Sequence, residues 1–321
     1  MSTVSVIIRT FDRPEFLQRA LEDLSRQIRL PDEVIIVNDG GDSQLITPLI
    51  EASDLQTTLI SNDKRLGGPK AGNIGVRAAQ SDYLVLHDDD DTWHPDFLLA
   101  TTKWLDTHPE QPAIVTPIDI VYERRESEHA PYTEYSRMAF EPGHAEFTLF
   151  DLLKTNRFTP IGLVYRRSIH DEMGYYDETL PVVDDWDFHM RLASHSPIPV
   201  LPGPALAFWR QRPDATGAES NSVFAAHEAH RRFDLLRRDV ALRSDPAGLG
   251  GLLYLTRFID DRFQELTDRI TAQQRAYDAH VDQLRRALEE RNSQLANVEE
   301  AISDASVVSL IRRRWRRFRH R

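Results

Sequence analysis

Short apolar runs alternate with amphipathic segments along the first hundred residues of the chain. The runs that begin at Val4, Val34 and Tyr83 are rich in Val, Ile and Leu, which is typical of strands buried on both faces. Between them, residues 13–27 and 68–81 place apolar side chains at helical spacing. Strands that alternate with helices predict an α/β fold, with a mostly parallel sheet covered by helices on both faces.

The pattern becomes mixed from Thr101 onward. Trp186 and Met190 share one side of a predicted helix, and Asp184 and Asp187 lie on the other, so the first side is expected to face the core. The polar stretch that ends near Gly143 has no clear period. Strand, helix, strand and helix are predicted in turn at residues 113–122, 147–156, 159–167 and 182–194.

The composition changes after Ser244. A glycine-rich joint at residues 245–251 leads into a long helical run, and a heptad seam extends from Ile270 to Ile302. The seam predicts a coiled coil and a homo-oligomer, although a helix folded back on the rest of the chain has the same stripe. We therefore expect three parts, which are residues 1–245, 246–305 and 306–321.

The net charge limits the partners of the protein. The chain has 51 acidic and 39 basic residues and a net charge of −12, and seven arginines lie among its last ten residues. Without those seven the body carries −12 − 7 = −19, a charge that nucleic acid would repel, so no nucleic-acid partner is expected. Cysteine is absent, which excludes disulfides, thiolate metal sites and a cysteine nucleophile.

The arginine-rich tail at residues 306–321 has the pattern of an amphipathic helix. Trp315 and Phe318 lie on its apolar side, an arrangement typical of helices that lie in the interface of an anionic membrane. A solvated basic end, or a contact to the acidic body of another subunit, is the alternative. Because no basic leader and no membrane-length apolar run is present, we expect a cytoplasmic protein, peripheral at the inner face of the membrane.

Four consecutive aspartates, Asp88 to Asp91, follow the predicted strand at Tyr83. Adjacent like charges favour their neutral forms unless a cation or N–H donors face them. In an extended segment Asp88 and Asp90 project to one side and Asp89 to the other. Two carboxylates suit Mg²⁺ or Mn²⁺ with phosphate oxygens in the remaining positions, which indicates a nucleoside diphosphate. A solvated acidic loop that caps the following helix is an equal alternative.

Other polar residues follow the remaining strands, and ligands bind in this type of sheet at the carboxyl ends of the strands. Asp39 could accept hydrogen bonds from a ribose or a base, or it could be a turn residue. Lys70, at the start of a predicted helix, could offset phosphate charge. Asp184 and Asp185 begin another helix, where simple capping also explains them.

The order of six motifs resembles glycosyltransferase family 2, whose members have the GT-A fold. The motifs are "VSVIIRTFDRPEFLQRAL", "VIIVNDGGDS", "GGPKAGNIGVRAA", "DYLVLHDDDDTWHPDFL", "GYYDETLPVVDDWDFHMRLA" and "FWRQR". By this resemblance Asp185 is the catalytic base, and Asp90, with Asp88, is the metal ligand. Together with the residues above, the resemblance implies that the nucleotide sugar is bound by Thr10, Phe11, Asp12, Asp39, Lys70, Asp88 and Asp89.

Three residues depart from the family pattern. Arg9 stands where proline or a small residue is common, Gly72 replaces a usual arginine, and Arg212 takes the position of a frequent histidine. Lys70 could supply the positive charge that is missing at Gly72. Asp184 in place of glutamate is a milder change.

The resemblance implies an inverting, metal-dependent glycosyltransferase of the hexosyltransferase type that uses Mn²⁺ or Mg²⁺. Its donor would be a nucleoside-diphosphate sugar, with a UDP-sugar favoured, and its acceptor a glycan or lipid-linked hydroxyl in polysaccharide or glycolipid assembly. Residues 1–110 would then form the nucleotide-binding half and 111–245 the acceptor half of the catalytic domain. A metal-dependent nucleotidyltransferase and a non-catalytic coiled-coil scaffold are the alternatives.

Overall fold

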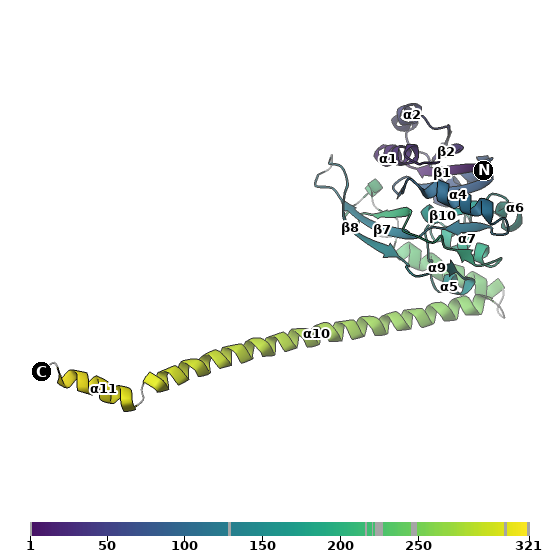
Figure 1. The fold of residues 1–321 in the computed structure, drawn as a ribbon. Helices are drawn as coiled ribbons and strands as arrows, with labels where there is room; N and C mark the ends of the chain where they lie inside the picture. The colour runs from purple at the N-terminus through teal and green to yellow at the C-terminus, as the bar shows by residue number, and fades with distance from the viewer. Residues whose placement is uncertain are drawn as a thin grey trace. The chain divides into compact units, whose positions relative to one another are not determined.

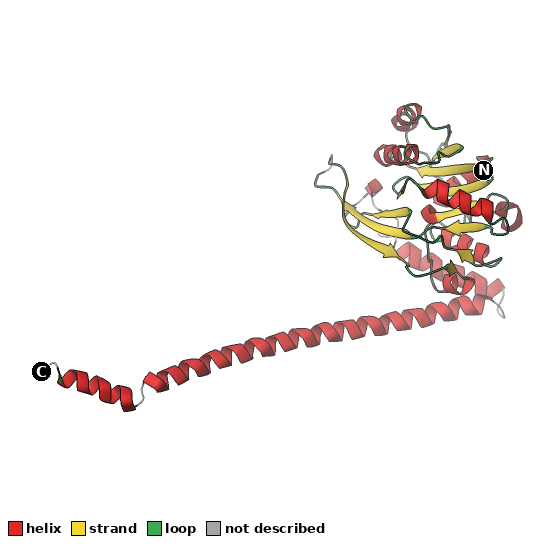
Figure 2. Cartoon of the chain, viewed as in Figure 1, coloured by secondary structure: helices red, strands yellow, loops and turns green. Residues whose placement is uncertain are grey.

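The computed structural model describes residues 2–127, 130–215, 217–219, 221, 227–244, 249–304 and 307–319. The chain divides into two compact units, Met1–Arg257 and Phe258–Arg321. The first unit contains the sheets, and the second is helical (Figures 1 and 2). The expected boundaries at 245 and 305, like most of the glycine-rich joint, fall outside the described residues.

The central sheet has six strands in the order β3-β2-β1-β4-β10-β6. The first four of these strands are parallel, whereas β10 is antiparallel to both of its neighbours. This mostly parallel sheet confirms the predicted fold class. In chain order its strands are β1 Val4–Thr10, β2 Glu33–Asn38, β3 Thr57–Ser61, β4 Tyr83–Asp88, β6 Ala113–Val115 and β10 Leu163–Arg166.

Helices connect the parallel strands, as the apolar spacing predicts. Leu17, Leu21 and Leu24 of the first helix are buried in the core. The third helix packs on β1 and β2, and Gly75 permits this close approach, because a Cβ at that position would lie 2.3 Å from Cγ2 of Ile7. The helices are α1 Pro14–Ser25, α2 Ser43–Glu51, α3 Gly68–Ala78 and α4 Phe97–Thr107.

A second, four-stranded sheet has the order β5-β12-β7-β8. The strand predicted at 113–122 is therefore two strands in different sheets, since the chain leaves β6 before Pro117, which has no N–H for a ladder. The pattern did not predict β8, because both of its faces are largely exposed. These strands are β5 Thr92–Trp93, β7 Ile118–Arg124, β8 Thr133–Phe140 and β12 Ala207–Gln211, and a separate pair is β9 Glu146–Phe147 with β11 Ile198–Pro199.

Shorter helices complete the first unit. In α7 the acidic residues Asp184 and Asp187 are buried along with Trp186, so the polar side of this helix also faces protein. These helices are α5 Leu149–Lys154, α6 Ile169–Met173, α7 Asp184–Ala193 and α9 His227–Ser244, with 3₁₀ turns at Pro160–Gly162 and Gly217–Glu219.

The C-terminal part is helical, as predicted. Helix α10 covers Leu249–Asp304, and α11 covers Val307–Phe318. The seam residues Leu288 and Ile302 are 64% and 66% exposed. In the described part of the chain, every helix is too short or too polar to span a membrane.

Candidate active site

The carboxyl ends of β1, β2 and β4 lie side by side, because these strands are parallel and paired in register. Thr10 is aligned with Asn38, and Arg9 is aligned with Asp88. The backbone N–H of Asp39 donates to the carbonyl of Thr10 at 2.9 Å. The structure therefore brings together three of the segments that the sequence assigns to the nucleotide.

The carboxylate of Asp39 is hydrogen-bonded to other residues of the chain. It accepts hydrogen bonds from Asn62 Nδ2 at 2.9 Å and from the backbone N–H groups of Leu66 and Gly67 at 2.9 and 2.8 Å. These contacts fix the loop that leads into α3. They give Asp39 a structural role beside the predicted ligand contact.

Phe11 and Lys70 lie beside this loop, whereas Asp12 contacts the loop that follows β2. Asp12 has a positive φ of 51°, and its Oδ1 accepts from the backbone N–H of Asp42 at 3.0 Å. The guanidinium of Arg65 stacks on the Phe11 ring at 4.4 Å from the centroid. Lys70 is exposed on the first turn of α3. Lys70 is thus open to a ligand, whereas Arg65 stacks on the partly exposed ring of Phe11.

Each of the first three aspartates in the run from Asp88, the last residue of β4, to Asp91 is paired with an arginine. Nε of Arg9 donates to Oδ1 of Asp88 at 3.1 Å, and Nη2 donates to the same oxygen. Nη1 of Arg13 donates to Oδ1 of Asp89 at 3.0 Å. Burial favours a higher pKa for Asp88, but the charge and the hydrogen bonds of Arg9, together with the charge of Arg13, lower the pKa below its ordinary value. Asp89 differs, since burial raises its pKa to about 7 despite Arg13.

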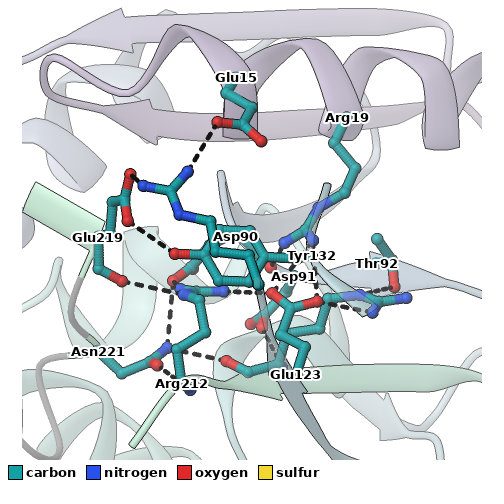
Figure 3. Close-up of polar contacts among 12 residues, drawn as sticks. Glu15, Arg19, Asp90, Asp91, Thr92, Glu123, Tyr132, Arg212, Glu219 and Asn221 are labelled. Atoms are coloured by element: carbon teal, nitrogen blue, oxygen red, sulfur yellow. Dashed lines mark hydrogen bonds and ion pairs between the residues drawn. The ribbon is translucent and has the colours of Figure 1, made fainter. Parts of the chain in front are cut away.

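Asp90 belongs to a buried cluster around Arg212 (Figure 3). Nη2 of Arg212 donates to Oδ2 of Asp90, and Asn221 Nδ2 donates to the same oxygen at 3.2 Å. Nη1 of Arg13 lies 3.5 Å from that oxygen. The Arg212 side chain is 1% exposed, so it is fixed in place, and Arg212 Nε also donates to the carbonyl of Glu219 at 2.9 Å.

Glu123 of β7 holds this cluster together from the second sheet. It accepts from Arg212 Nη1 at 2.6 Å, and from Arg19 and Arg210 at 3.0 Å each. Sequence reasoning did not assign a role to any of these four residues in the acidic site. Asp91, the last aspartate, accepts from the backbone N–H of Arg210 at 2.8 Å, and burial raises its pKa well above the ordinary value.

A second acidic pair lies at the first turn of α7, after Val183 in a left-handed conformation. Burial raises the pKa of Asp184 to about 7, and the charge of Asp185 adds to the rise. Burial also raises the pKa of Asp185. Asn156, which follows α5, donates from Nδ2 to Oδ2 of Asp185 at 2.8 Å and contacts His189 Nδ1 at 3.0 Å. No motif or apolar pattern in the sequence pointed to Asn156.

Arg9 links the two acidic groups. Burial opposes its charge, but the carboxylates of Asp88 and Asp184 together raise the pKa of Arg9. Asp88 also acts electrostatically on Asp185. The end of β4 and the start of α7 therefore face one location, as a site with a ligand-binding and a proton-accepting part requires.

Asp88 and Asp90 are the residues predicted to hold a divalent ion. They provide the oxygen ligands that Mg²⁺ or Mn²⁺ prefers, but in both residues a guanidinium binds the carboxylate. Among the described residues, no group of three or more His, Cys, Asp or Glu side chains could hold a metal. As arranged, these residues do not fit the predicted ion, which stays a prediction.

Comparison with solved structures places the first unit in a known fold class. TarS of S. aureus in complex with UDP-GlcNAc has a TM-score of 0.55 at 20% identity, over 73% of this chain and 66% of TarS. The mannosyltransferase PcManGT of Pyrobaculum calidifontis, in complex with GDP-Man and Mn²⁺, has a TM-score of 0.53 at 16% identity, over 80% and 69%. The sheet order and these neighbours define the GT-A fold of glycosyltransferases.

The sequence match assigns the family. The family described as Glycosyl transferase family 2 matches residues 5–174, which is more than half of the chain. The uncharacterized glycosyltransferase YwdF of Bacillus subtilis is 31% identical over 191 residues, which are 59% of this chain and 68% of YwdF. The chain therefore belongs to glycosyltransferase family 2, and the suspected resemblance is confirmed.

Proposed function

We propose that this glycosyltransferase moves a sugar from a nucleoside-diphosphate sugar to an acceptor hydroxyl with inversion at the anomeric carbon. The observation that supports this most is that the carboxylates of Asp88 and Asp184 both act electrostatically on Arg9, as expected if the end of β4 and the start of α7 serve one site. The donor would lie across the ends of β1, β2 and β4. The acceptor would approach the first turn of α7.

Asp185 would act as the base. Its carboxylate takes the proton of the acceptor hydroxyl while that oxygen attacks the anomeric carbon, and the bond from this carbon to the diphosphate oxygen breaks with its electron pair. The raised pKa of Asp185, which burial causes, makes the carboxylate a better proton acceptor. The hydrogen bond from Asn156 would keep the carboxylate oriented.

The nucleotide would bind near Thr10, Phe11, Asp12 and Asp39, with Lys70 within reach of the phosphates. A UDP-sugar is the favoured donor, because TarS, which shares the fold, was solved with UDP-GlcNAc. We retain a hexose as the transferred sugar and a polysaccharide or glycolipid as the product, both from the family resemblance. Arginines already bind Asp88 and Asp90, the two residues predicted to hold the divalent ion.

A transfer assay tests this proposal. The purified protein is incubated with UDP-, GDP- and dTDP-sugars, the release of nucleoside diphosphate is measured, and the anomeric configuration of any product is read by NMR. Release of nucleoside diphosphate with inversion is expected. Release of pyrophosphate would identify the nucleotidyltransferase alternative, and retention at the anomeric carbon would remove Asp185 from the role of base. If no donor is bound or cleaved, the scaffold alternative gains support.

The C-terminal helices would bring the enzyme to its acceptor. We propose that α10 pairs with a second copy through its heptad seam and that α11 contacts an anionic membrane surface, where a lipid-linked acceptor would be found. The exposed seam residues of α10 and the exposed Trp315 and Phe318 of α11 support this. The catalytic domain would then end near residue 245, before these helices.

A further inference from the structure

Nitrogen atoms of three side chains surround the carboxylate of Asp90. Oδ2 of Asp90 is bound by Arg212 and Asn221 and lies 3.5 Å from Arg13. A guanidinium has only N–H donors and no lone pair to offer a metal, whereas the histidine that is frequent at the position of Arg212 in the family pattern is a common metal ligand. The substitution at this position therefore replaces a possible ligand by a permanent positive charge on the same carboxylate.

Asp88 repeats this arrangement from another strand. Arg9 on β1 binds Oδ1 of Asp88 through two nitrogens. Its guanidinium also lies against the start of α3, since a Cβ at Gly68 would be 3.3 Å from Nη1 of Arg9. The Arg9 side chain remains 18% exposed, so a ligand at the ends of the strands can contact it.

The ionised carboxylates of the cluster already have arginine partners in place of a metal. A divalent ion stabilises a diphosphate leaving group because it brings positive charge to an acidic site. Here the positive charge belongs to the chain, and an added divalent ion would be repelled by guanidiniums held next to its ligands. Four carboxylates, those of Asp88, Asp89, Asp90 and Glu123, pair with five guanidiniums, those of Arg9, Arg13, Arg19, Arg210 and Arg212, and Asp91 accepts from the backbone N–H of Arg210.

We propose that Arg9 and Arg212 supply, at Asp88 and Asp90, the positive charge that a divalent ion would supply, so that the donor is bound and used without such an ion. Arg9 contacts the diphosphate of the donor. Arg212 is a positioning residue, which neutralises Asp90 and holds it against Glu123. This inference rests on the proposed function, because it concerns the donor of that reaction.

A binding experiment distinguishes a donor site that needs a divalent ion from one that does not. Isothermal titration calorimetry measures the affinity of the full chain for UDP, GDP and dTDP, once with EDTA and once with MnCl₂. We expect one nucleotide to bind with equal affinity, within about threefold, in both buffers. A nucleotide that binds only with Mn²⁺, or more than about tenfold better with it, overturns this inference and leaves the proposed function intact. If no nucleotide binds in either buffer and no donor is cleaved, both fail.

Two variants assign the effect to the arginines. Arg9→Met should weaken nucleotide binding in EDTA by about tenfold or more, because a charge-assisted contact is lost. Mn²⁺ should restore part of it, since Asp88 is then unpaired. Arg26→Met is the matched control, because Arg26 is 72% exposed and pairs only with Glu22 in the contacts described. Arg9→Met with the affinity of wild type in EDTA would overturn the role of Arg9.

Arg212→His tests the other position. The imidazole removes the fixed charge from Asp90 and adds a ligand, so nucleotide binding should become dependent on Mn²⁺, and electron paramagnetic resonance should detect bound Mn²⁺ that wild type lacks. A folded variant, verified by circular dichroism, that still binds nucleotide equally in both buffers would contradict the role of Arg212. If the variant does not fold, the wild-type titrations and Arg9→Met decide the question.

Discussion

The side chain of Arg9 lies next to the position where a side chain at Gly72 would begin. A Cβ at Gly72 would be 3.5 Å from Cδ of Arg9 and 3.7 Å from its Nη1. The arginine that the family pattern places on α3 is absent, and an arginine on β1 reaches the same region. Arg9 therefore brings a guanidinium next to the position where the family pattern has an arginine.

Asp185→Asn should lower the rate of sugar transfer by roughly 10²-fold or more, because the amide cannot take the proton of the acceptor. Donor affinity, measured by calorimetry, should change little. Asp171→Asn, at an exposed acidic residue of α6, is the control and should transfer at the wild-type rate. An equal loss of donor binding in Asp185→Asn would place Asp185 in the nucleotide site.

Asn156→Ala should shift the acidic limb of the pH–rate profile to higher pH. The hydrogen bond from Asn156 favours the charged form of Asp185 and so lowers its pKa, and its removal lets burial raise the pKa further. Because the base acts as a carboxylate, activity then appears only at a higher pH. Measurements of kcat from about pH 5 to 9 test this, and an unchanged limb with a uniformly lower rate would indicate a purely structural role.

Glu123→Gln should destabilise the fold by about 3 to 5 kcal/mol, since it leaves three guanidiniums without their shared carboxylate in a buried site. Urea unfolding followed by circular dichroism measures the change. Glu126→Gln, three residues along the chain at an exposed position, should alter the free energy of unfolding by less than about 0.5 kcal/mol. Equal stability of the two variants would show that the cluster contributes little.

Deletion of residues 306–321 should release the protein from anionic liposomes and leave donor hydrolysis intact. Near an anionic surface each arginine contributes on the order of 1 kcal/mol, and Trp315 and Phe318, which are 72% and 82% exposed, would insert. Cosedimentation with anionic and neutral liposomes measures this, and high salt should weaken it. The double substitution of Trp315 and Phe318 by alanine separates insertion from charge. An intact protein that stays in solution with anionic liposomes at low salt would exclude the membrane contact.

Self-association through α10 should depend on its seam. Leu284→Glu with Leu288→Glu places charges at two exposed seam positions and should convert an oligomer into a monomer. Ser293→Glu lies on the opposite side of the helix and should leave the oligomer unchanged. Light scattering well above micromolar concentration decides the question, and a monomeric wild-type protein would remove the coiled-coil interpretation.

The parallel strands could be predicted because Val, Ile and Leu fill both faces of β1, β2 and β4. Strand β8 could not, because exposed residues on both faces leave no period to detect. The break at Pro117 was visible only as a proline inside an apolar run. The local pattern of apolar residues therefore identified the strands whose own side chains are apolar and buried on both faces.

The acidic segments could also be located in the sequence, but their partners could not. Arg212 and Asp90 are separated by 122 positions, and Glu123 meets Arg210 across 87. No period or motif connects residues at such distances, since only the pairing of β12 with β7 and β5 brings them together. The residues around Asp90 therefore predict a metal ligand, because they do not show that Arg212, directly after β12 of the second sheet, binds the same carboxylate.

The late position of Arg212 in the chain has a consequence for biosynthesis. The ribosome synthesises Asp88 to Asp91 well over a hundred residues before Arg212 and Asn221. Strand β12 must then pair with β7 before Arg212 and Asn221 can bind Asp90. During that interval the nascent chain carries an acidic segment with part of its counter-charge missing. Fragments that end between residues 167 and 220 should therefore be poor expression products, although they contain every strand of the central sheet.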